Sequence, residues 1–424
     1  MKRLLCVTPA FPPNNAADCH RVRMALPYFQ ENGWEAEVLA VRPKLVEAVQ
    51  EPELTSTFPP AIPVHRVGAI PQGFTRALGF GSLGLRAGYF LKKKGDQLLR
   101  DGKFDAVYFS STVFSTFWMG ERWKTKFGVP FFIDYQDPWW SDYHNGRGQR
   151  PPGGWFKYNL VQRNARHEEG RVMREAAGVT CVSPAYVEML RGRYAKEDAG
   201  KFVELPFGAA EHDAELAAKE APAGGTEVWR YIGRGGEDMK TALQIFAAVL
   251  RQSPPGGFRL ELVGTSYASG AQAKQTLLPV LTKNLPAGRV TENPGRIGYL
   301  ESLGRLRSAH RLVLFGSDDP GYTASKLYPY ILAKRPLLAI CREESSVARI
   351  LRETGGGEVI TFGEEEVRFG GRIRIRPEWK QAMGRWLEMD PAKEPGTDWH
   401  AFQPYTAREM TERLCRFFDQ RLGG

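Results

Sequence analysis

Short apolar segments alternate with longer segments of helical periodicity along most of this chain. The apolar segments contain runs of Val, Leu, Ile and Phe without polar alternation, which is typical of parallel strands covered by helices on both faces. They predict strands at Leu4–Thr8, Glu37–Val41, Ala106–Ser110, Pro130–Asp134, Gly178–Ser183 and Phe202–Leu205, and then at Val228–Ile232, Arg259–Val263, Val290–Asn293, Leu312–Phe315, Leu337–Cys341 and Gly357–Thr361. Intervening segments such as Asp18–Asn32 and Lys240–Arg251 have the spacing of amphipathic helices.

This alternation occurs twice in 424 residues, which predicts an α/β protein with two doubly wound parallel-sheet domains. We expect a first domain at 1–205, a linker rich in Ala, Gly and Pro at 206–225, a second domain at 226–398 and a terminal helical segment at 399–424. Ligands of such sheets bind at the carboxyl ends of the strands, so the loops that follow strands are the places to look for chemistry.

Composition and charge narrow the function classes. The net charge of +10 favours an anionic partner, but acidic and basic residues are interspersed and no nucleic-acid-binding motif is present, so we expect no nucleic acid partner. The five cysteines are scattered without CxxC spacing, which indicates a reducing cytoplasm and no metal site. No apolar run is long enough to span a bilayer. Phe11–Pro13 ends the first apolar segment too early for an export signal.

Several motifs follow the predicted strands in a recognisable order. They are Leu4-Leu-Cys-Val-Thr-Pro-Ala-Phe-Pro-Pro13, Asp134-Tyr-Gln-Asp-Pro-Trp139, Leu205-Pro-Phe-Gly208, Tyr231-Ile-Gly-Arg234, Leu262-Val-Gly264, Gly298-Tyr-Leu-Glu-Ser-Leu303 and Thr323-Ala-Ser-Lys-Leu-Tyr-Pro-Tyr330. Over nearly the whole chain this order resembles the GT-B glycosyltransferases of the retaining family 4. The resemblance implies two Rossmann-like domains facing a central cleft, with a nucleotide-diphosphate sugar of the UDP or GDP type as co-substrate and no other cofactor or metal. It also implies that the terminal helix crosses back to brace the first domain.

The donor site is predicted in the second domain. Arg234 and Lys240 follow its first strand, and their cationic groups suit phosphate oxygens. By resemblance they form the clamp for the donor diphosphate and act as catalytic residues. Close approach of the backbone to the donor is expected at Gly233, Gly235 and Gly236. A second donor element is expected where a helix begins and its free N–H groups can bind an anion, at Thr323, Ala324, Ser325 and Lys326.

The sequence departs from the family at two positions. Many members carry two glutamates eight residues apart around this loop, and here the corresponding positions are Gly321 and Pro329. Asp319 or its neighbour Asp318 could replace the first carboxylate, and Glu301 is another candidate donor contact. Alternatives therefore stay open beside a retaining transferase: a non-catalytic binding or scaffold protein, and an enzyme of the same fold with a different outcome, such as an inverting transferase or a nucleotide-sugar epimerase. A Rossmann oxidoreductase is a further alternative, which the sequence disfavours because no strand is followed by a complete GxGxxG with its acidic partner.

The acceptor site is predicted in the first domain. Asn14 and Asn15 replace the family's glycine-rich loop after the first strand, and Arg21 lies in the following helix. Asp134 and Asp137 follow a buried strand, and Asp137 is the candidate to contact sugar hydroxyls or to take the acceptor proton. Two readings of Trp139 stay open, because an indole either stacks on a sugar or packs in the core.

The segment Phe74–Lys103 combines large apolar residues with Lys92-Lys-Lys94. It fits either a peripheral contact with the inner face of the cell membrane or a core helix with a basic last turn. Taken together, the sequence predicts a cytoplasmic, metal-independent glycosyltransferase. Its acceptor would be a glycan, a lipid-linked sugar or a small molecule, in cell-surface polysaccharide or glycoconjugate synthesis, and the resemblance implies retention at the anomeric carbon.

Overall fold

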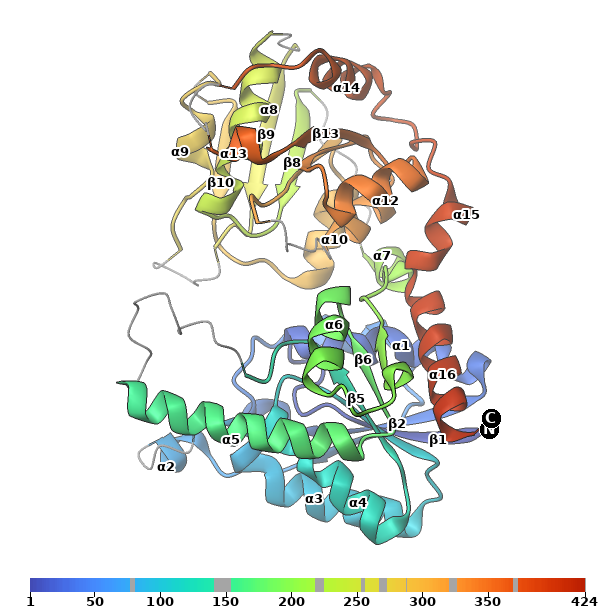
Figure 1. Ribbon diagram of the computed structural model, residues 1–424. Helices are drawn as coiled ribbons and strands as arrows, with labels where there is room; N and C mark the ends of the chain where they lie inside the picture. The colour runs from blue at the N-terminus through green and yellow to red at the C-terminus, as the bar shows by residue number, and fades with distance from the viewer. Residues whose placement is uncertain are drawn as a thin grey trace. The chain divides into compact units, whose positions relative to one another are not determined.

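A computed structural model describes residues 1–76, 81–140, 154–217, 225–252, 256–266, 273–286, 288–319, 326–368 and 373–423. They form two compact units (Figure 1): unit 1 comprises Met1–Gly208 and Ala407–Gly424, and unit 2 comprises Ala209–Thr406. Each unit is built on a parallel sheet, so the predicted pair of doubly wound α/β domains is confirmed. No helix within the described ranges is both long and apolar enough to cross a membrane.

The sheet of unit 1 has the order β3-β2-β1-β4-β5-β6-β7. Its strands are β1 (Lys2–Val7), β2 (Trp34–Val41), β3 (Val64–Val67), β4 (Ala106–Ser110), β5 (Phe131–Tyr135), β6 (Gly178–Cys181) and β7 (Phe202–Glu204). The α-helices are α1 (His20–Ala25), α2 (Gln72–Arg76), α3 (Leu83–Asp101), α4 (Trp118–Phe127), α5 (Gly154–Glu175), α6 (Pro184–Arg193) and α16 (Ala407–Leu422).

Alternate residues of the unit 1 strands point to opposite faces, as the period of a strand requires. On one face Phe109 stacks on Trp123 of α4 and packs against Phe131. On the other face Phe132 packs against Phe418 of α16, with ring centroids 4.6 Å apart. Each such buried aromatic ring contributes about 1.5–3 kcal/mol. The predicted return of the terminal helix to the first domain is therefore observed for α16.

The sheet of unit 2 has the order β10-β9-β8-β11-β12-β13. Its strands are β8 (Glu227–Ile232), β9 (Phe258–Val263), β10 (Val290–Asn293), β11 (Arg311–Phe315), β12 (Leu337–Arg342) and β13 (Glu358–Phe362). The α-helices are α7 (Glu211–Leu216), α8 (Lys240–Gln252), α9 (Leu278–Leu281), α10 (Tyr299–Arg307), α11 (Leu327–Leu332), α12 (Ser346–Thr354), α13 (Glu364–Arg368), α14 (Pro377–Glu388) and α15 (Trp399–Phe402). On α8 the predicted apolar face is buried against the sheet, through Ala242, Leu243, Phe246, Ala247 and Leu250.

The structure differs from the predicted elements in three places. Strand β3 is missing from the prediction, because it is short, only partly buried and paired with β2 alone. The predicted helix at Asp18–Asn32 is broken, since α1 ends at Ala25 and a separate 3-10 turn, Leu26–Tyr28, follows with Pro27 in it. The chain passes between the units at Gly208 and Ala407, so the predicted segment 399–424 is divided, with α15 in unit 2 and α16 in unit 1.

Candidate active site

Each sheet has a point at which the strand order reverses, between β1 and β4 in unit 1 and between β8 and β11 in unit 2. Chain connections leave such a point in opposite directions and open a crevice at the carboxyl ends of the strands, where ligands of doubly wound folds bind. Of the predicted site residues, Asn14 and Asn15 follow β1, Arg234 and its neighbouring glycines follow β8, and Asp319 follows β11, whereas Asp134 and Asp137 lie at the end of β5 and Glu301 lies in α10. Each crevice is therefore a candidate site, and each is described by itself.

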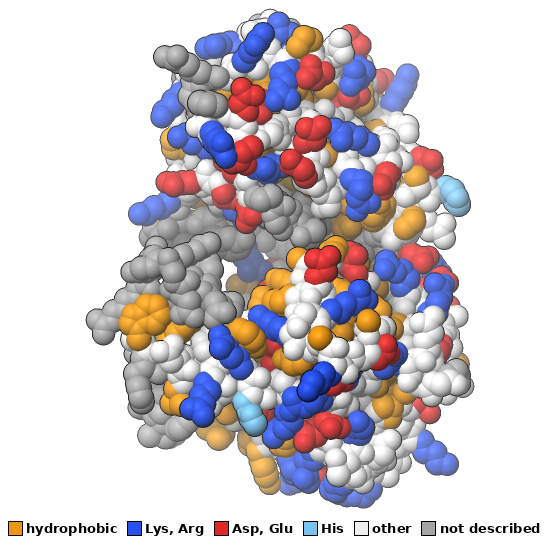
Figure 2. All heavy atoms as spheres, viewed as in Figure 1, with side chains coloured by type: hydrophobic (Ala, Val, Ile, Leu, Met, Phe, Trp, Pro, Cys, Tyr) orange, Lys and Arg blue, Asp and Glu red, His pale blue; other side chains and the backbone are white. Residues whose placement is uncertain are grey.

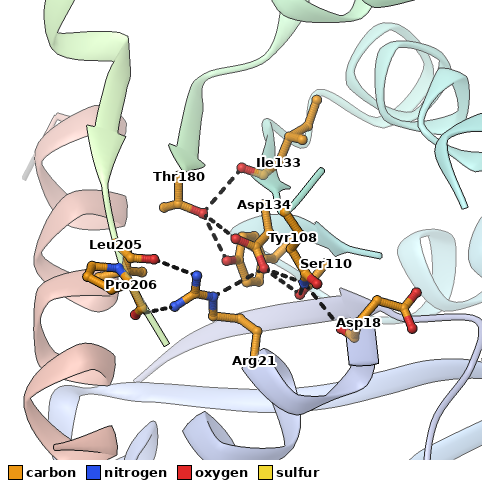
Figure 3. Close-up of polar contacts among 10 residues, drawn as sticks. Asp18, Arg21, Tyr108, Ser110, Ile133, Asp134, Thr180, Leu205 and Pro206 are labelled. Carbon is orange, nitrogen blue, oxygen red and sulfur yellow. Dashed lines mark hydrogen bonds and ion pairs between the residues drawn. The ribbon is translucent and has the colours of Figure 1, made fainter. Parts of the chain in front are cut away.

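A buried polar network lies at the carboxyl ends of the unit 1 strands (Figure 3). The Asp134 carboxylate accepts hydrogen bonds from Arg21 Nε at 3.1 Å, from Ser110 Oγ at 2.8 Å and from Gln136 Nε2 at 2.7 Å. Thr180 Oγ1 donates to its other oxygen at 3.1 Å. Asp134 is thus surrounded by donors from β4, from the end of β5, from β6 and from α1.

Arg21 extends this network to the residues that directly follow β7. Its two terminal nitrogens donate to the carbonyl oxygens of Leu205 and Pro206, at 2.5 and 2.8 Å. The side chains of Arg21 and Asp134 are both fully buried. Sequence reasoning placed both at the acceptor, whereas the structure places them beneath the strand ends. In this arrangement they fix the loops of the crevice, and direct contact with an acceptor would require both side chains to move.

Two further carboxylates of this crevice are Asp18, which is buried, and Asp137, which is exposed. Asp18 accepts hydrogen bonds from Ser111 Oγ at 2.7 Å and from the Thr112 N–H at 3.0 Å. Asp137 is exposed, yet desolvation by the surrounding protein raises the pKa of its carboxyl above the usual value, and the negative charge of Asp18 adds to this shift. Asp18 was not among the predicted residues. Its position two residues before α1 was the available signal.

The loop that carries Asp137 is held by buried Glu169 of α5. The Glu169 carboxylate accepts from Tyr135 Oη at 3.0 Å, from Trp140 Nε1 at 3.1 Å and from Tyr194 Oη at 2.8 Å. The Trp139 ring stacks on Phe114 with centroids 5.4 Å apart, and the backbone N–H of Trp139 donates to Tyr135 Oη. Trp139 thus packs against core aromatics, and stacking on a sugar stays a prediction for it.

The loop after β1 contains Asn14 and Asn15. Asn15 is tied to its surroundings, because its amide nitrogen donates to Glu51 at 2.7 Å. Asn14 is fully buried, and neither its amide oxygen nor its nitrogen has a hydrogen-bond partner among the described residues. Unpaired buried amides are rare in folded proteins. Within the described part of the chain, Asn14 and the Thr8 hydroxyl thus have unused hydrogen-bonding capacity in this loop.

In unit 2 the crevice is organised by an ion pair of Arg234 with Asp238. Arg234 follows β8, and its terminal nitrogens donate to the two oxygens of Asp238 at 2.9 and 2.5 Å. Ser317 Oγ, after β11, donates to the same carboxylate at 2.5 Å. The hydrogen bonds from Arg234 lower the pKa of the Asp238 carboxyl below its usual value. Asp238 was not predicted, although its spacing of four residues from Arg234 was a visible signal.

Lys326 reaches the same crevice from the start of α11. A Cβ atom built on Gly233 would lie 3.2 Å from Lys326 Nζ, so the ammonium group sits against the backbone at the end of β8. Desolvation by burial lowers the pKa of Lys326 to about 8, and the positive charge of Arg234 contributes to the shift. Its ammonium group has no carboxylate or hydrogen-bond acceptor among the described residues. A half-buried, uncompensated cation beside an arginine is a site for an anion.

The neighbouring glycines are packed against side chains of the crevice. A Cβ atom on Gly235 would approach Thr276 Oγ1 to 2.4 Å, and one on Gly236 would approach Asp238 to the same distance. A larger residue at either position would displace these side chains. Their predicted contact with a donor stays a prediction.

The other predicted donor residues are distributed as follows. Lys240 begins α8 and is exposed. Glu301 is an exposed helix residue that accepts from the Gly298 N–H and pairs with Arg305 at 2.7 Å. Asp319 is exposed after β11. Thr323, Ala324 and Ser325, like Gly321, lie outside the described residues. Within the described ranges no group of three or more His, Cys, Asp or Glu side chains is arranged to hold a metal ion.

Residues 20–208 of the chain match the family described as "Glycosyl transferase 4-like domain". No curated protein matches the chain in sequence. Among solved structures the chain is similar to HepE from Anabaena in complex with UDP-glucose, with 16% identity, a TM-score of 0.59 and coverage of 99% of this chain and 100% of that one.

Two further solved structures share this architecture. A sucrose-phosphate synthase from Thermosynechococcus elongatus is 15% identical over 99% of both chains, with a TM-score of 0.56. A UDP-forming trehalose-phosphate synthase from Burkholderia xenovorans is 13% identical over 100% of this chain and 99% of that one, with a TM-score of 0.57. The predicted likeness to GT-B glycosyltransferases is therefore confirmed, and the chain has the GT-B fold.

Proposed function

We propose that this GT-B chain, whose residues 20–208 match a glycosyl transferase 4-like domain, transfers a sugar from a nucleoside-diphosphate sugar to a hydroxyl acceptor. The observation that carries the proposal is the pair of cations Arg234 and Lys326 at the switch point of the unit 2 sheet. Lys326 has no anionic partner among the described residues, and a diphosphate supplies the charge that the crevice lacks.

In this proposal Arg234 and Lys326 act electrostatically. As the bond between the sugar and the diphosphate breaks, negative charge grows on the leaving phosphate oxygen. Cations that are fixed in a desolvated site stabilise this charge without reorganising, an effect worth about 3–4 kcal/mol for one well-placed donor in other enzymes. Lys240 is exposed at the start of α8. It would stabilise the same charge only if its side chain moved toward a bound donor.

Asp137 is the proposed acceptor-side group. Its raised pKa makes its carboxylate a stronger base than an ordinary aspartate, which suits a hydrogen bond to an acceptor hydroxyl and uptake of its proton. The network of Glu169 and Tyr135 holds the loop on which it lies. The acceptor class is a glycan, a lipid-linked sugar or a small molecule, and retention at the anomeric carbon is expected from the resemblance alone.

The proposal is tested with a panel of nucleoside diphosphates and their sugars in a thermal-shift assay, followed by a donor hydrolysis assay. We expect one nucleoside diphosphate to raise the melting temperature of the native chain and not that of Arg234→Ala. Slow hydrolysis of the matching sugar nucleotide, lost in Arg234→Ala, would support an enzyme. Binding without hydrolysis or transfer would favour a scaffold protein, and conversion of the sugar at C2 would favour an epimerase. Absence of any nucleotide response would refute the donor site.

A further inference from the structure

Helix α3 carries an unpartnered outer face. Leu85, Tyr89 and Lys93 are exposed at successive spacings of four residues, whereas Ala87 and Leu91 are buried in the core. The exposed fractions of Leu85 and Tyr89 are 57% and 65%. Ile70, 45% exposed, lies beside the first turn of this helix, because its N–H donates to the Arg86 carbonyl at 3.0 Å. The apolar part of this face thus lies at the beginning of α3.

Helix α5 shows the same arrangement. Large apolar side chains are exposed in its first two turns, where Trp155, Leu160 and Val161 have exposed fractions of 42%, 51% and 54%. Exposed Arg163 and Arg166 follow them. Figure 2, drawn from the viewpoint of Figure 1, shows hydrophobic side chains on the surface near the start of α5, with Lys and Arg side chains along the unit beyond them.

These two apolar ends lie toward the same edge of the unit 1 sheet. Helix α3 leads into β4 and helix α5 leads into β6, and both strands are parallel to their neighbours. A helix that connects parallel strands runs antiparallel to them, so its first turns lie near the carboxyl ends of the strands. Figure 1 shows both helices starting on the same side of the unit. Asp18 and Asp137 lie at this same edge.

The sequence around the two apolar ends is predominantly basic, and the carboxylates of Glu47 and Asp96 that reach α3 are paired with Arg86 and Lys92. From Leu54 to Gly95 the sequence contains no Asp or Glu, and the same is true from Tyr143 to His167. Both stretches contain several Lys and Arg residues, among them Lys92-Lys-Lys94 and Arg163. Exposed apolar groups within a mainly basic part of the chain match the chemistry of an anionic lipid surface, which offers apolar chains beneath negative headgroups.

We infer that the first turns of α3 and α5, together with Ile70, dock unit 1 on an anionic lipid bilayer. A second copy of this chain is a poorer occupant, because it would bring two basic, acid-free stretches together. The inference rests on the proposed function in one respect: docking by this edge holds Asp137 near the membrane, where a lipid-linked acceptor presents its sugar. Vesicle binding itself requires no donor and is measured separately.

The experiment is sedimentation of the full chain with extruded vesicles, without nucleotide, at low and high salt. The vesicles are of phosphatidylcholine alone or mixed with phosphatidylglycerol. The variants are Leu85→Glu with Tyr89→Glu, and Trp155→Glu with Leu160→Glu. The matched control is Leu216→Glu, which places the same charge on an exposed apolar position of unit 2. Melting temperatures and the nucleotide response are measured on every variant, to show that each is folded.

We expect the native chain and Leu216→Glu to bind the anionic vesicles, and to bind them less tightly at high salt. Both should bind the neutral vesicles weakly or not at all. Each double variant should bind at least tenfold more weakly while its nucleotide response is kept. No binding of the native chain, or equal binding of the double variants, would overturn the inference. Self-association that the same substitutions abolish, without vesicle binding, would assign the face to a second copy instead. A variant that loses the nucleotide response but still binds vesicles would count against the proposed function and not against membrane docking.

Discussion

Arg234 donates two hydrogen bonds to the Asp238 carboxylate, at 2.9 and 2.5 Å, and so uses both of its terminal nitrogens within the chain. A donor diphosphate bound at Arg234 must compete with this carboxylate. We therefore expect Asp238→Asn, which removes the competing charge and keeps the side-chain shape, to bind the nucleoside diphosphate more tightly, by roughly tenfold at low salt. Calorimetry measures the change. Weaker binding would instead show that Asp238 orients the guanidinium.

Lys326→Met should separate binding from stability. The native ammonium is half-buried with no counter-charge among the described residues, so its replacement removes a desolvation cost. We expect the melting temperature at pH 7 to be unchanged or higher, while nucleoside diphosphate binding falls at least tenfold. Lys240→Met is the comparison, because Lys240 is exposed at the start of the neighbouring helix. A lower melting temperature for Lys326→Met would indicate a structural lysine.

The pH dependence of nucleotide binding should report the Lys326 ammonium. Its pKa of about 8 means that the lysine is charged below pH 8 and progressively neutral above it. The terminal phosphate, with a pKa of about 6, is already fully ionised there. A bound anion raises the lysine pKa, so affinity should fall as pH rises past 8, by up to about tenfold per unit, until the pKa of the complex is reached. In Lys326→Met this decline should be absent.

Much of the architecture could be predicted from the sequence, because buried parallel strands are uniformly apolar and leave a local pattern. Strand β3 left none, being short and partly exposed at the sheet edge. The candidate site residues were harder to predict than the strands. Arg234 was predicted from its position after a strand, but the pairing of Arg21 with Asp134 joins residues that are 113 positions apart. Local sequence contains no record of such a pairing, so the buried network of Arg21 and Asp134 could not be predicted from it.

This buried pair leads to a stability prediction. Arg21→Met leaves the Asp134 carboxylate fully buried without its cation and also removes the donors to Leu205 and Pro206. Breaking a buried ion pair from one side costs about 3–5 kcal/mol. We expect denaturant unfolding to show a loss of this size for Arg21→Met. Adding Asp134→Asn should recover part of it, since the unpaired charge is then gone. Additive losses in the double variant would mean that the two residues are not energetically coupled.

The last prediction concerns Asp137, whose role depends on its charge rather than on its packing. Its side chain is exposed, so Asp137→Asn should leave the melting temperature and nucleoside diphosphate binding unchanged. Sugar transfer should fall by about 10²–10⁴-fold, the usual contribution of a positioned base. The raised pKa adds a second signature: the native rate should fall as pH drops through the Asp137 pKa, at a pH above that of an ordinary aspartate. Asp18→Asn should move this limb to lower pH, because it removes the negative charge that helps to raise the Asp137 pKa. If Asp18→Asn leaves the pH dependence of the rate unchanged, the group that titrates in this profile is not the Asp137 carboxyl.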